Sequence, residues 1–251
     1  MRAALKYAPS ILVLALMIAV WEGAARAFAV PDWLLPPPTA VAAALASETR
    51  SLLEGALVTL GEVAIGFALA SALGFALACA LAWSGWLERG LYPLVIGITT
   101  LPVLAITPQL VVWFGLGIGS KIAVIALIAF FPIVVNLFDG LRSAERGMVD
   151  MFRLLGASRW QIFVKLRLPG ALPQLFTGLK LAAVASVIGA VVGEWIGGSA
   201  GLGYIIKLKG VQIETDVTFA AIALLMVMST ALFVLVKAAE GLLLRRYPQG
   251  G

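Results

Sequence analysis

The chain has 251 residues, of which 62% are hydrophobic and only 12% are charged. Soluble domains carry roughly 45–50% apolar residues, so this composition excludes a water-soluble globular fold. The net charge of +5 would fit nucleic-acid binding in a soluble protein, but here the basic residues lie between apolar runs, as in membrane proteins. There is no histidine and one cysteine, Cys79, which excludes histidine-based acid–base chemistry, histidine metal ligands and an intramolecular disulfide.

The length of the chain fits several membrane-spanning helices and one sizeable loop. A helix needs about 20 residues to cross the hydrocarbon core of a bilayer. The sequence therefore predicts an all-α integral membrane protein of about six spans, folded as a single transmembrane domain over residues 1–251.

The first span is expected over residues 9–29. A cleaved signal peptide is the alternative, because two basic residues precede the apolar run and the residues near Ala27 weakly resemble a cleavage site. Residues 30–54 then form an external connector, in which three prolines from Pro36 onward stiffen the chain before a short alanine-rich surface helix.

Two predicted spans carry small residues on one face. The second span is expected over residues 56–83 and the fifth over residues 175–196. Small residues four apart lie on one side of a helix and let a neighbouring helix approach closely in lipid. We therefore expect both spans to pack tightly against a neighbour. The small residues are Gly66, Ala70, Gly74, Ala78 and Ala82 in the second span and Ala185, Gly189, Gly193 and Gly197 in the fifth.

The third apolar stretch, residues 91–116, is expected to be broken. Its three prolines free backbone groups that lipid cannot satisfy, so this region should face protein or a watery cavity. Interrupted membrane helices often mark a substrate path. The glycine-rich turn from Gly115 is not a nucleotide-binding loop, because no strand precedes it. The polar path candidates in this stretch are Thr99, Thr100, Thr107 and Gln109.

Five ionisable residues fall in or near predicted spans, where an ionised group at mid-bilayer costs roughly 2.5–3.5 kcal/mol. Two of them, Asp139 and Lys237, lie close enough to the inner ends to reach water and are given no special role. Glu62 either faces the translocation path or pairs with a cation on a neighbouring helix, and the sequence leaves both open. Glu194, beside Trp195, is either an interfacial carboxylate or a gate in the path. Lys180 is expected to extend its amine toward the aqueous surface. Glu62 and Glu194 complete the candidate path residues.

The fourth and last spans are expected over residues 122–141 and 219–236. Cytoplasmic loops carry an excess of Lys and Arg. The basic residues are most numerous on one side if both termini are cytoplasmic, and we predict that orientation. The cytoplasmic set is Arg2, Lys6, Arg89, Arg142, Arg146, Arg153, Arg159, Lys165, Arg167, Arg245 and Arg246, against Arg26, Arg50, Lys121, Lys207 and Lys209 outside.

One long segment belongs in water, the loop over residues 142–173. In its first half, Met148, Met151, Phe152 and Leu155 recur at three- and four-residue spacing, which predicts a helix with an apolar stripe. The stripe fits either a docking surface for a partner or a connector that rests on lipid headgroups.

The second half of this loop predicts another short helix. Gly156 is a natural helix stop, and Ser158 lies three residues before Gln161, which is the spacing of a capping box. Pro169 should end this second helix. The loop is therefore expected to be two short helices joined at Gly156 and Ala157.

The run LGASRWQIFVKLRLPGALP, residues 155–173, resembles the glycine-centred cytoplasmic loop of ABC importer permeases, often called the EAA loop. Further pieces across nearly the whole chain resemble the nitrate, sulfonate and taurine branch of these permeases. They are LLPPPTAV near Leu35, WFGLGIGSK from Trp113, FFPIVVN from Phe130 and GLGYII from Gly201.

The resemblance implies a type I importer with two permease subunits, here a homodimer, two cytoplasmic ATPase subunits and an external or periplasmic substrate-binding protein, in a bacterial inner membrane. ATP and Mg would bind the partner ATPase, and no cofactor, metal or nucleic acid is expected on this chain. By the same resemblance, the short helix of the loop inserts into a groove of the ATPase. The residues implied in this coupling are Asp150, Met151, Phe152, Leu155, Gly156, Ala157 and Ser158.

Two positions depart from the family pattern. Asp150, Met151 and Phe152 stand where the family loop reads Glu-Ala-Ala, so the acid is shorter and the two small residues are bulky. Glu62 is an acid near a position where relatives commonly carry a basic residue. We therefore do not carry over an anion site from the family.

The sequence predicts the transmembrane permease subunit of an ATP-driven importer for a small solute, either a sulfonate-like or nitrate-like anion or a small organic nutrient. The chain has no Gly-x-x-x-x-Gly-Lys-Ser/Thr motif, so a partner must hydrolyse ATP. The alternative is an ion-coupled secondary transporter that uses Glu62 and Glu194. A membrane-embedded enzyme is disfavoured, because histidine is absent and the acids form no recognisable motif.

Overall fold

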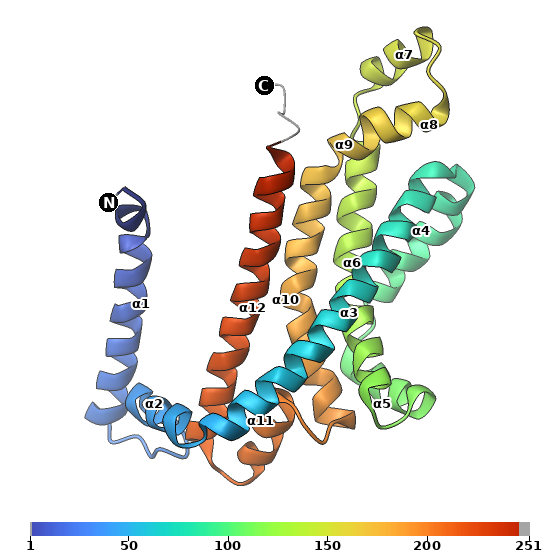
Figure 1. The fold of residues 1–251 in the computed structure, drawn as a ribbon. Helices are drawn as coiled ribbons and strands as arrows, with labels where there is room; N and C mark the ends of the chain where they lie inside the picture. Colours follow the sequence, from blue (N-terminus) through green and yellow to red (C-terminus); the bar gives the residue numbers. More distant parts are fainter. Residues whose placement is uncertain (1, 246–251) are drawn as a thin grey trace. The chain divides into compact units, whose positions relative to one another are not determined.

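The computed structural model describes residues 2–245, so Arg246 of the predicted cytoplasmic set lies outside the described residues, as do the side chains of Arg2 and Lys6. Residues 2–245 contain no strand, and the all-α prediction is confirmed (Figure 1). The helices are α1 Arg2–Ala27, α2 Pro38–Ser47, α3 Thr49–Trp83, α4 Gly85–Thr99, α5 Val103–Phe114, α6 Ile118–Arg142, α7 Arg146–Leu154, α8 Arg159–Ile162, a π-helix Phe163–Arg167, α9 Leu168–Gly170, α10 Leu172–Gly197, α11 Leu202–Val211 and α12 Thr215–Leu244.

Four helices within the described range are long and apolar enough to cross a bilayer, namely α3, α6, α10 and α12. The helices α4 and α5 are long and apolar enough only as a pair, and they are bent by 105° at a short break, as in a broken span or a re-entrant loop. Pro102 immediately precedes α5 at the break, whereas Pro93 and Pro108 lie inside helices. The predicted break in the third apolar stretch is therefore confirmed. The predicted first span falls in α1, and its crossing of the bilayer stays a prediction.

The external connector predicted over residues 30–54 is shorter in the structure. The expected alanine-rich helix is α2, but α3 already begins at Thr49 and runs for 35 residues. At about 1.5 Å per residue, α3 is about 50 Å long, whereas the hydrocarbon core is about 30 Å thick. Because α3 is longer than the hydrocarbon core is thick, its first turns can extend beyond the core. These turns, from Thr49 onward, take the place of the last residues of the predicted connector.

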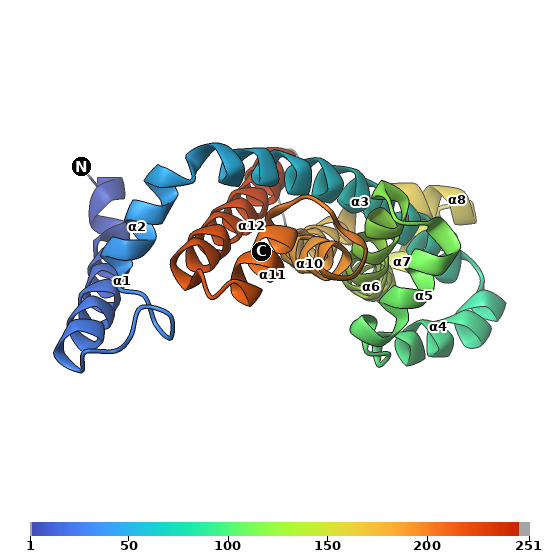
Figure 2. The ribbon, with the colours of Figure 1, turned by 90° about the horizontal axis from the view of Figure 1, so that it is seen from below.

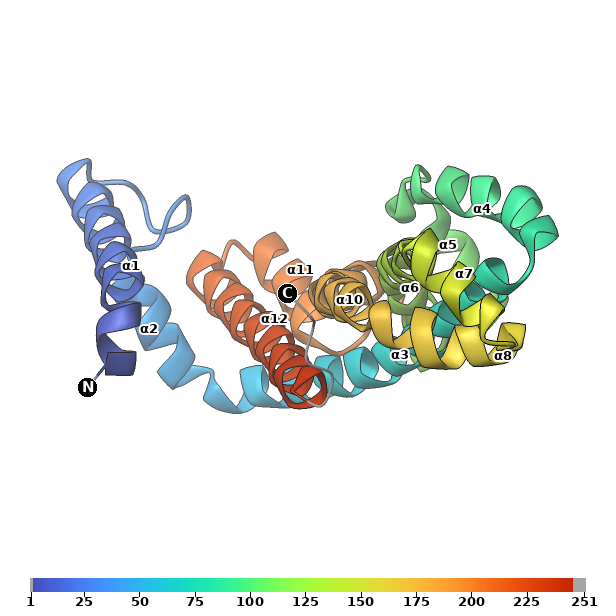
Figure 3. The ribbon, with the colours of Figure 1, turned by 90° about the horizontal axis from the view of Figure 1, so that it is seen from above.

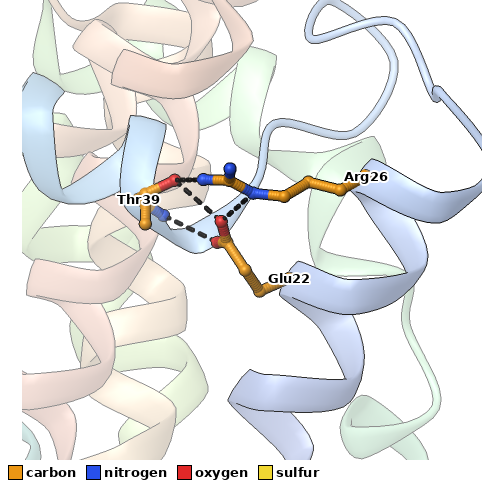
Figure 4. A network of polar contacts seen from close by, with 3 residues as sticks. All are labelled: Glu22, Arg26 and Thr39. Atoms are coloured by element: carbon orange, nitrogen blue, oxygen red, sulfur yellow. Dashed lines mark hydrogen bonds and ion pairs between the residues drawn. The ribbon is translucent and has the colours of Figure 1, made fainter.

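The chain forms two compact units, and the prediction of a single transmembrane domain stays a prediction. The first unit comprises Met1–Val58 and Ala200–Leu225. Within it, the carboxylate of Glu22 on α1 accepts hydrogen bonds from Arg26 at 2.6 Å and from the backbone N–H and hydroxyl of Thr39 on α2 at 3.1 and 3.0 Å (Figure 4). These hydrogen bonds hold α2 against the end of α1.

The second unit comprises Thr59–Ser199 and Met226–Gly251, and α6 is its central helix. α3 and α6 contact one another in the same residue order, so they run parallel. The pairs are Glu62 with Lys121, Gly66 with Ile125 and Gly74 with Ile133.

α10 packs against α6 in the opposite direction. Figures 2 and 3 show the two helices side by side. Their contacts occur in reverse residue order, which makes the helices antiparallel. The pairs are Gly178 with Ile133, Gly189 with Ile125 and Gly193 with Lys121.

The small-residue faces predicted on α3 and α10 are the faces that meet α6. A Cβ added at Gly66 would lie 2.5 Å from Cγ2 of Ile125, and a Cβ added at Gly189 would lie 2.9 Å from Cα of Ile125. Carbon atoms pack at about 3.5–4.0 Å, so neither position has room for a side chain without movement. Ile125 is thus held between two glycines, and the prediction of tight packing is confirmed.

Lys180 does not extend alone toward water as predicted. Its Nζ lies 2.8 Å from a carboxylate oxygen of Glu240 on α12, and both side chains are about four-fifths buried. The difference arises because α12 brings an acid 60 residues away in the chain against α10, which the local sequence around Lys180 does not reveal.

Candidate functional site

The loop predicted to couple to an ATPase begins as α6 ends at Arg142. As expected, it contains two short helical segments, α7 and the segment from α8 to α9, with Gly156 and Ala157 between them. Gly156 has φ +79°, a left-handed conformation that favours glycine because it has no Cβ. The chain therefore turns at the predicted position.

Backbone hydrogen bonds fix this turn. The N–H of Gly156 donates to the carbonyl of Arg153 at 2.9 Å, and the N–H of Ala157 donates to the carbonyl of Phe152 at 2.9 Å. These two bonds are those of a Schellman motif, which satisfies the free carbonyls at the end of α7.

The capping box predicted at the start of the next helix is present. The hydroxyl of Ser158 accepts from the N–H of Gln161 at 3.2 Å, and the N–H of Ser158 donates to the side chain of Gln161 at 2.8 Å. Pro169 does not end the helical segment as predicted. The helical segment runs on through Pro169 to Gly170. A π-helix over Phe163–Arg167 comes directly before it, and such local π-helical adjustments accommodate the backbone groups that a proline leaves without a donor.

The helix α7 has two chemically different faces. Met148, Met151 and Leu154 lie on one side and are 39%, 46% and 89% exposed. Val149 and Arg153 lie on the other side, where Val149 is buried. The apolar face therefore has no cover within the described chain, while the other face packs inward.

The remaining predicted coupling residues lie around this exposed face. Leu155 is 77% exposed, and Asp150 is exposed and pairs with Arg153 at 3.0 Å. Phe152 is only half-buried and contributes less to the exposed stripe than Leu154, which the sequence interpretation did not include. Leu154 follows Met151 by three residues, so the same spacing would have included it.

A second group of polar residues is buried between α3, α6 and α10. Oε1 of Glu62 lies 2.6 Å from Nζ of Lys121, and both side chains are more than nine-tenths buried. Of the two roles left open for Glu62, the structure shows the pairing with a cation on a neighbouring helix. Oε2 of Glu62 is buried without a hydrogen-bond partner among the described residues.

Glu194 of α10 lies in the same region of the second unit. Its Oε1 accepts a hydrogen bond from the hydroxyl of Thr59 at 2.7 Å, and both residues are fully buried. Glu194 is thus covered by protein, although its neighbour Trp195 is 42% exposed, and its role as a gate stays a prediction. Thr59 was not among the residues predicted from the sequence. The only feature of the sequence that indicates its role is its position on α3, one helical turn before Glu62.

The path candidates on the broken span fall into two groups. Thr99, Thr100 and Gln109 are exposed, whereas Thr107 is buried and donates to the carbonyl of Val103 at 2.8 Å. Thr99 lines a groove of about 440 Å³ that lies between the bent helices and α6. The groove is otherwise apolar except for Asn136.

Long apolar helices, a bent span and a loop with a fixed glycine turn together define a helical membrane protein of the transport type. Residues 70–247 match the family model described as "Binding-protein-dependent transport system inner membrane component", and the chain belongs to this family. It is therefore a permease subunit of the ABC importer class, as the sequence predicted.

Three relatives illustrate the range of this family. A formylaminopyrimidine transport permease protein of Halalkalibacterium halodurans is 39% identical over 94% of this chain and 94% of its own length. A riboflavin transport system permease protein of Chloroflexus aurantiacus is 37% identical over 92% and 87%. A putative aliphatic sulfonates transport permease protein of Escherichia coli is 33% identical over 92% and 89%.

The fold also matches a solved structure. The crystal structure of an amino acid ABC transporter with histidines has a TM-score of 0.63, covering 80% of this chain and 96% of that chain, at 15% sequence identity. At this identity the likeness concerns the fold alone.

Proposed function

We propose that this chain moves a small solute across the inner membrane in an importer powered by a separate ATPase. The observation that carries the proposal is the uncovered apolar face of α7, formed by Met148, Met151 and Leu154, beside the fixed turn at Gly156. An exposed apolar helix face in a loop outside the spans is suited to a groove of a partner protein. The partner is the ATPase, which holds ATP and Mg.

The assembly has two copies of this permease, two ATPase subunits and an external binding protein that delivers the solute. The loop and both termini face the cytoplasm, since this orientation places most of the basic residues there. The route from ATP to the spans starts at α7 and reaches α10 through the π-helix and α9, which join α8 to α10 without an intervening loop.

Copurification tests the docking face. Leu154→Asp should abolish copurification of the ATPase and ATP-driven uptake while the permease stays in the membrane, because a carboxylate on the apolar face would be desolvated in the groove. Leu116→Asp is the matched control, since Leu116 is also highly exposed but lies beyond the other end of α6. Normal copurification with Leu154→Asp would overturn the proposed docking.

For the solute, we propose a small, mostly neutral organic nutrient of the heterocyclic kind rather than a sulfonate. The groove beside the α4–α5 bend offers Thr99 and Asn136 as hydrogen-bonding groups and has no cationic side chain in its lining. Lys121, a buried cation of the second unit, is already paired with Glu62. A sulfonate would require a cation or several donors to replace its hydration.

Uptake by vesicles that contain the permease, the ATPase and the binding protein distinguishes these solutes. Formylaminopyrimidine and riboflavin are the heterocycles to test, because relatives are named for them, and an aliphatic sulfonate is the contrasting solute. ATP-dependent uptake of the sulfonate alone would contradict the assignment to heterocycles and leave the permease role intact.

A further inference from the structure

Arginines from four neighbouring elements converge on two adjoining grooves inside the loop of residues 142–173. The smaller groove has a volume of about 180 Å³ and the larger about 330 Å³. Arg153 of α7 and Arg167 of the π-helix line both grooves. We call them together the arginine grooves. Arg159 also lines the smaller groove, and Arg142 and Arg146 also line the larger.

Acidic residues neutralise only part of this positive charge. Arg142 pairs with Glu88 at 2.6 Å, and Arg153 pairs with Asp150, itself in the larger groove, at 3.0 Å. Within the described part of the chain, Arg146, Arg159 and Arg167 have no acidic partner. The arginine grooves therefore hold more guanidinium groups than carboxylates.

Arg167, which lines both grooves, has a hydrogen-bond donor without an acceptor. Its Nε is buried and has no hydrogen-bond partner among the described residues. A buried donor of a charged group that is left unpaired is expensive, and an anion in the grooves would supply the missing acceptor. Guanidinium groups present forked donors that match the oxygens of a phosphate.

The arginine grooves are separate from the apolar face that we assign to ATPase docking. Arg146, Val149 and Arg153 lie on the inward side of α7, and Val149 lines both grooves. Met148, Met151 and Leu154 lie on the outward side. A protein docked on the outward face would thus leave the grooves to another ligand.

Two tryptophans beside the arginine grooves favour a position of the grooves at the membrane surface. Trp83, the last residue of α3, lines the smaller groove and packs edge-on against Trp160 with ring centroids 5.9 Å apart. The two rings are 52% and 62% exposed. Exposed tryptophans at the end of a span are typical of headgroup depth, where lipid phosphates lie, and basic pockets at this depth bind anionic headgroups.

We propose that the arginine grooves bind a phosphate group, which occupies the space between α7 and the π-helix and is held by Arg153 and Arg167. The phosphate belongs either to an anionic phospholipid headgroup or to a soluble phosphate. In either case, the phosphate joins α7 to the segment that leads into α10, and so holds the inward face of α7 in place.

Two binding measurements on the whole purified chain distinguish the two sources. In neutral detergent, the midpoint of thermal unfolding is followed against inorganic phosphate at constant ionic strength. In parallel, native mass spectrometry measures retention of phosphatidylglycerol and of phosphatidylcholine after mild delipidation. Protection by inorganic phosphate supports a soluble ligand, and selective retention of phosphatidylglycerol supports a headgroup.

Arg153→Gln and Arg167→Gln should each weaken the binding by roughly tenfold, since one charge-assisted hydrogen bond of about 1.5 kcal/mol or more is lost. Lys165→Gln is the matched control, because Lys165 lies in the π-helix but lines neither groove. If Arg167→Gln does not fold, Arg153→Gln carries the test, because the Arg153 side chain is 65% exposed. The proposal is overturned if neither ligand binds, or if Lys165→Gln weakens binding as much as the groove variants do.

Discussion

Oε1 of Glu62 on α3 lies 2.6 Å from Nζ of Lys121 on α6, in a part of the second unit where both side chains are almost completely buried. The pair lies beside Gly193, where a Cβ would come within 3.1 Å of Cα of Lys121. Three spans therefore meet at one ion pair. Because ionised groups are costly in this environment, each partner depends on the other.

Removing one partner of this pair should destabilise the protein more than removing both. Lys121→Met or Glu62→Leu alone should cost about 3–5 kcal/mol, because the remaining charge is left buried and unpaired. The double variant should recover most of this loss. Thermal or denaturant unfolding of the four proteins in a double-mutant cycle measures the coupling.

The exposed pair Arg50 and Glu54 provides the matched control. Their side chains are 93% and 66% exposed, and such pairs contribute about 0–1 kcal/mol. Equal coupling energies for the two pairs would contradict the structural role assigned to Glu62.

Glycine substitutions should separate the close helix contacts from open positions. Gly189→Ala should destabilise the protein by about 1–3 kcal/mol, since its Cβ would meet the backbone of Ile125 at 2.9 Å, and backbone yields less easily than a side chain. Gly61→Ala in α3 is the control. Its Cβ would meet nothing within 4 Å, so better helix propensity should leave stability unchanged or slightly raised. Unfolding in the same detergent compares the two, and an equal loss at both positions would refute the packing argument.

Features governed by local sequence were predictable. The small-residue faces of α3 and α10 follow from the period of the helix, and the turn at Gly156 and the capping box at Ser158 depend on residues at most three or four positions away. The sequence therefore indicated which faces pack and where the loop turns.

Features that depend on distant pairing were not predictable. Glu62 and Lys121 are 59 residues apart, and Thr59 and Glu194 are 135 apart, so one sequence cannot show that they meet. Pro169 was expected to end its helix, but the π-helix that precedes it lets the helical segment run on to Gly170. Such outcomes are decided by tertiary packing rather than by local preference.

A side chain at Gly156 should impair the function of the loop of residues 142–173. Gly156→Ala would force a left-handed conformation on an L-residue at a cost of about 1–2 kcal/mol, and Gly156→Pro would also remove the N–H that bonds the carbonyl of Arg153. We expect reduced ATP-driven uptake for Ala and none for Pro, with normal amounts in the membrane. Gly147→Ala is the control, since Gly147 lies within α7 and an added Cβ would meet only Oε1 of Glu145, at 4.0 Å. Uptake by Gly156→Pro that matches the wild type would exclude the role of this turn.

Cysteine accessibility should sort the path candidates on the broken span. Cys79 is the only cysteine of the chain, so Cys79→Ser gives a cysteine-free background. If the groove belongs to a water-filled path, Thr99→Cys and Gln109→Cys should react with a membrane-impermeant thiol reagent, because no side chain of this protein covers them, whereas the buried Thr107→Cys should not. Protection of Thr99→Cys by the transported solute would place the groove in the path. Reaction of the Thr107 variant at the same rate as the others would contradict the observed burial.

The hydrogen bond from Thr59 to Glu194 offers a test that separates packing from transport. Thr59→Val keeps the shape of the side chain but removes the donor, which should cost about 1–3 kcal/mol because the carboxylate loses a partner in a buried site. Thr59→Ser keeps the hydroxyl and should lie close to the wild type in stability. If Glu194 also gates the path, Thr59→Val and Glu194→Gln should both change the rate of ATP-driven uptake in excess of any loss of folded protein, while Thr59→Ser should not. Uptake that simply follows the amount of folded protein in all three variants would restrict Glu194 to a structural role.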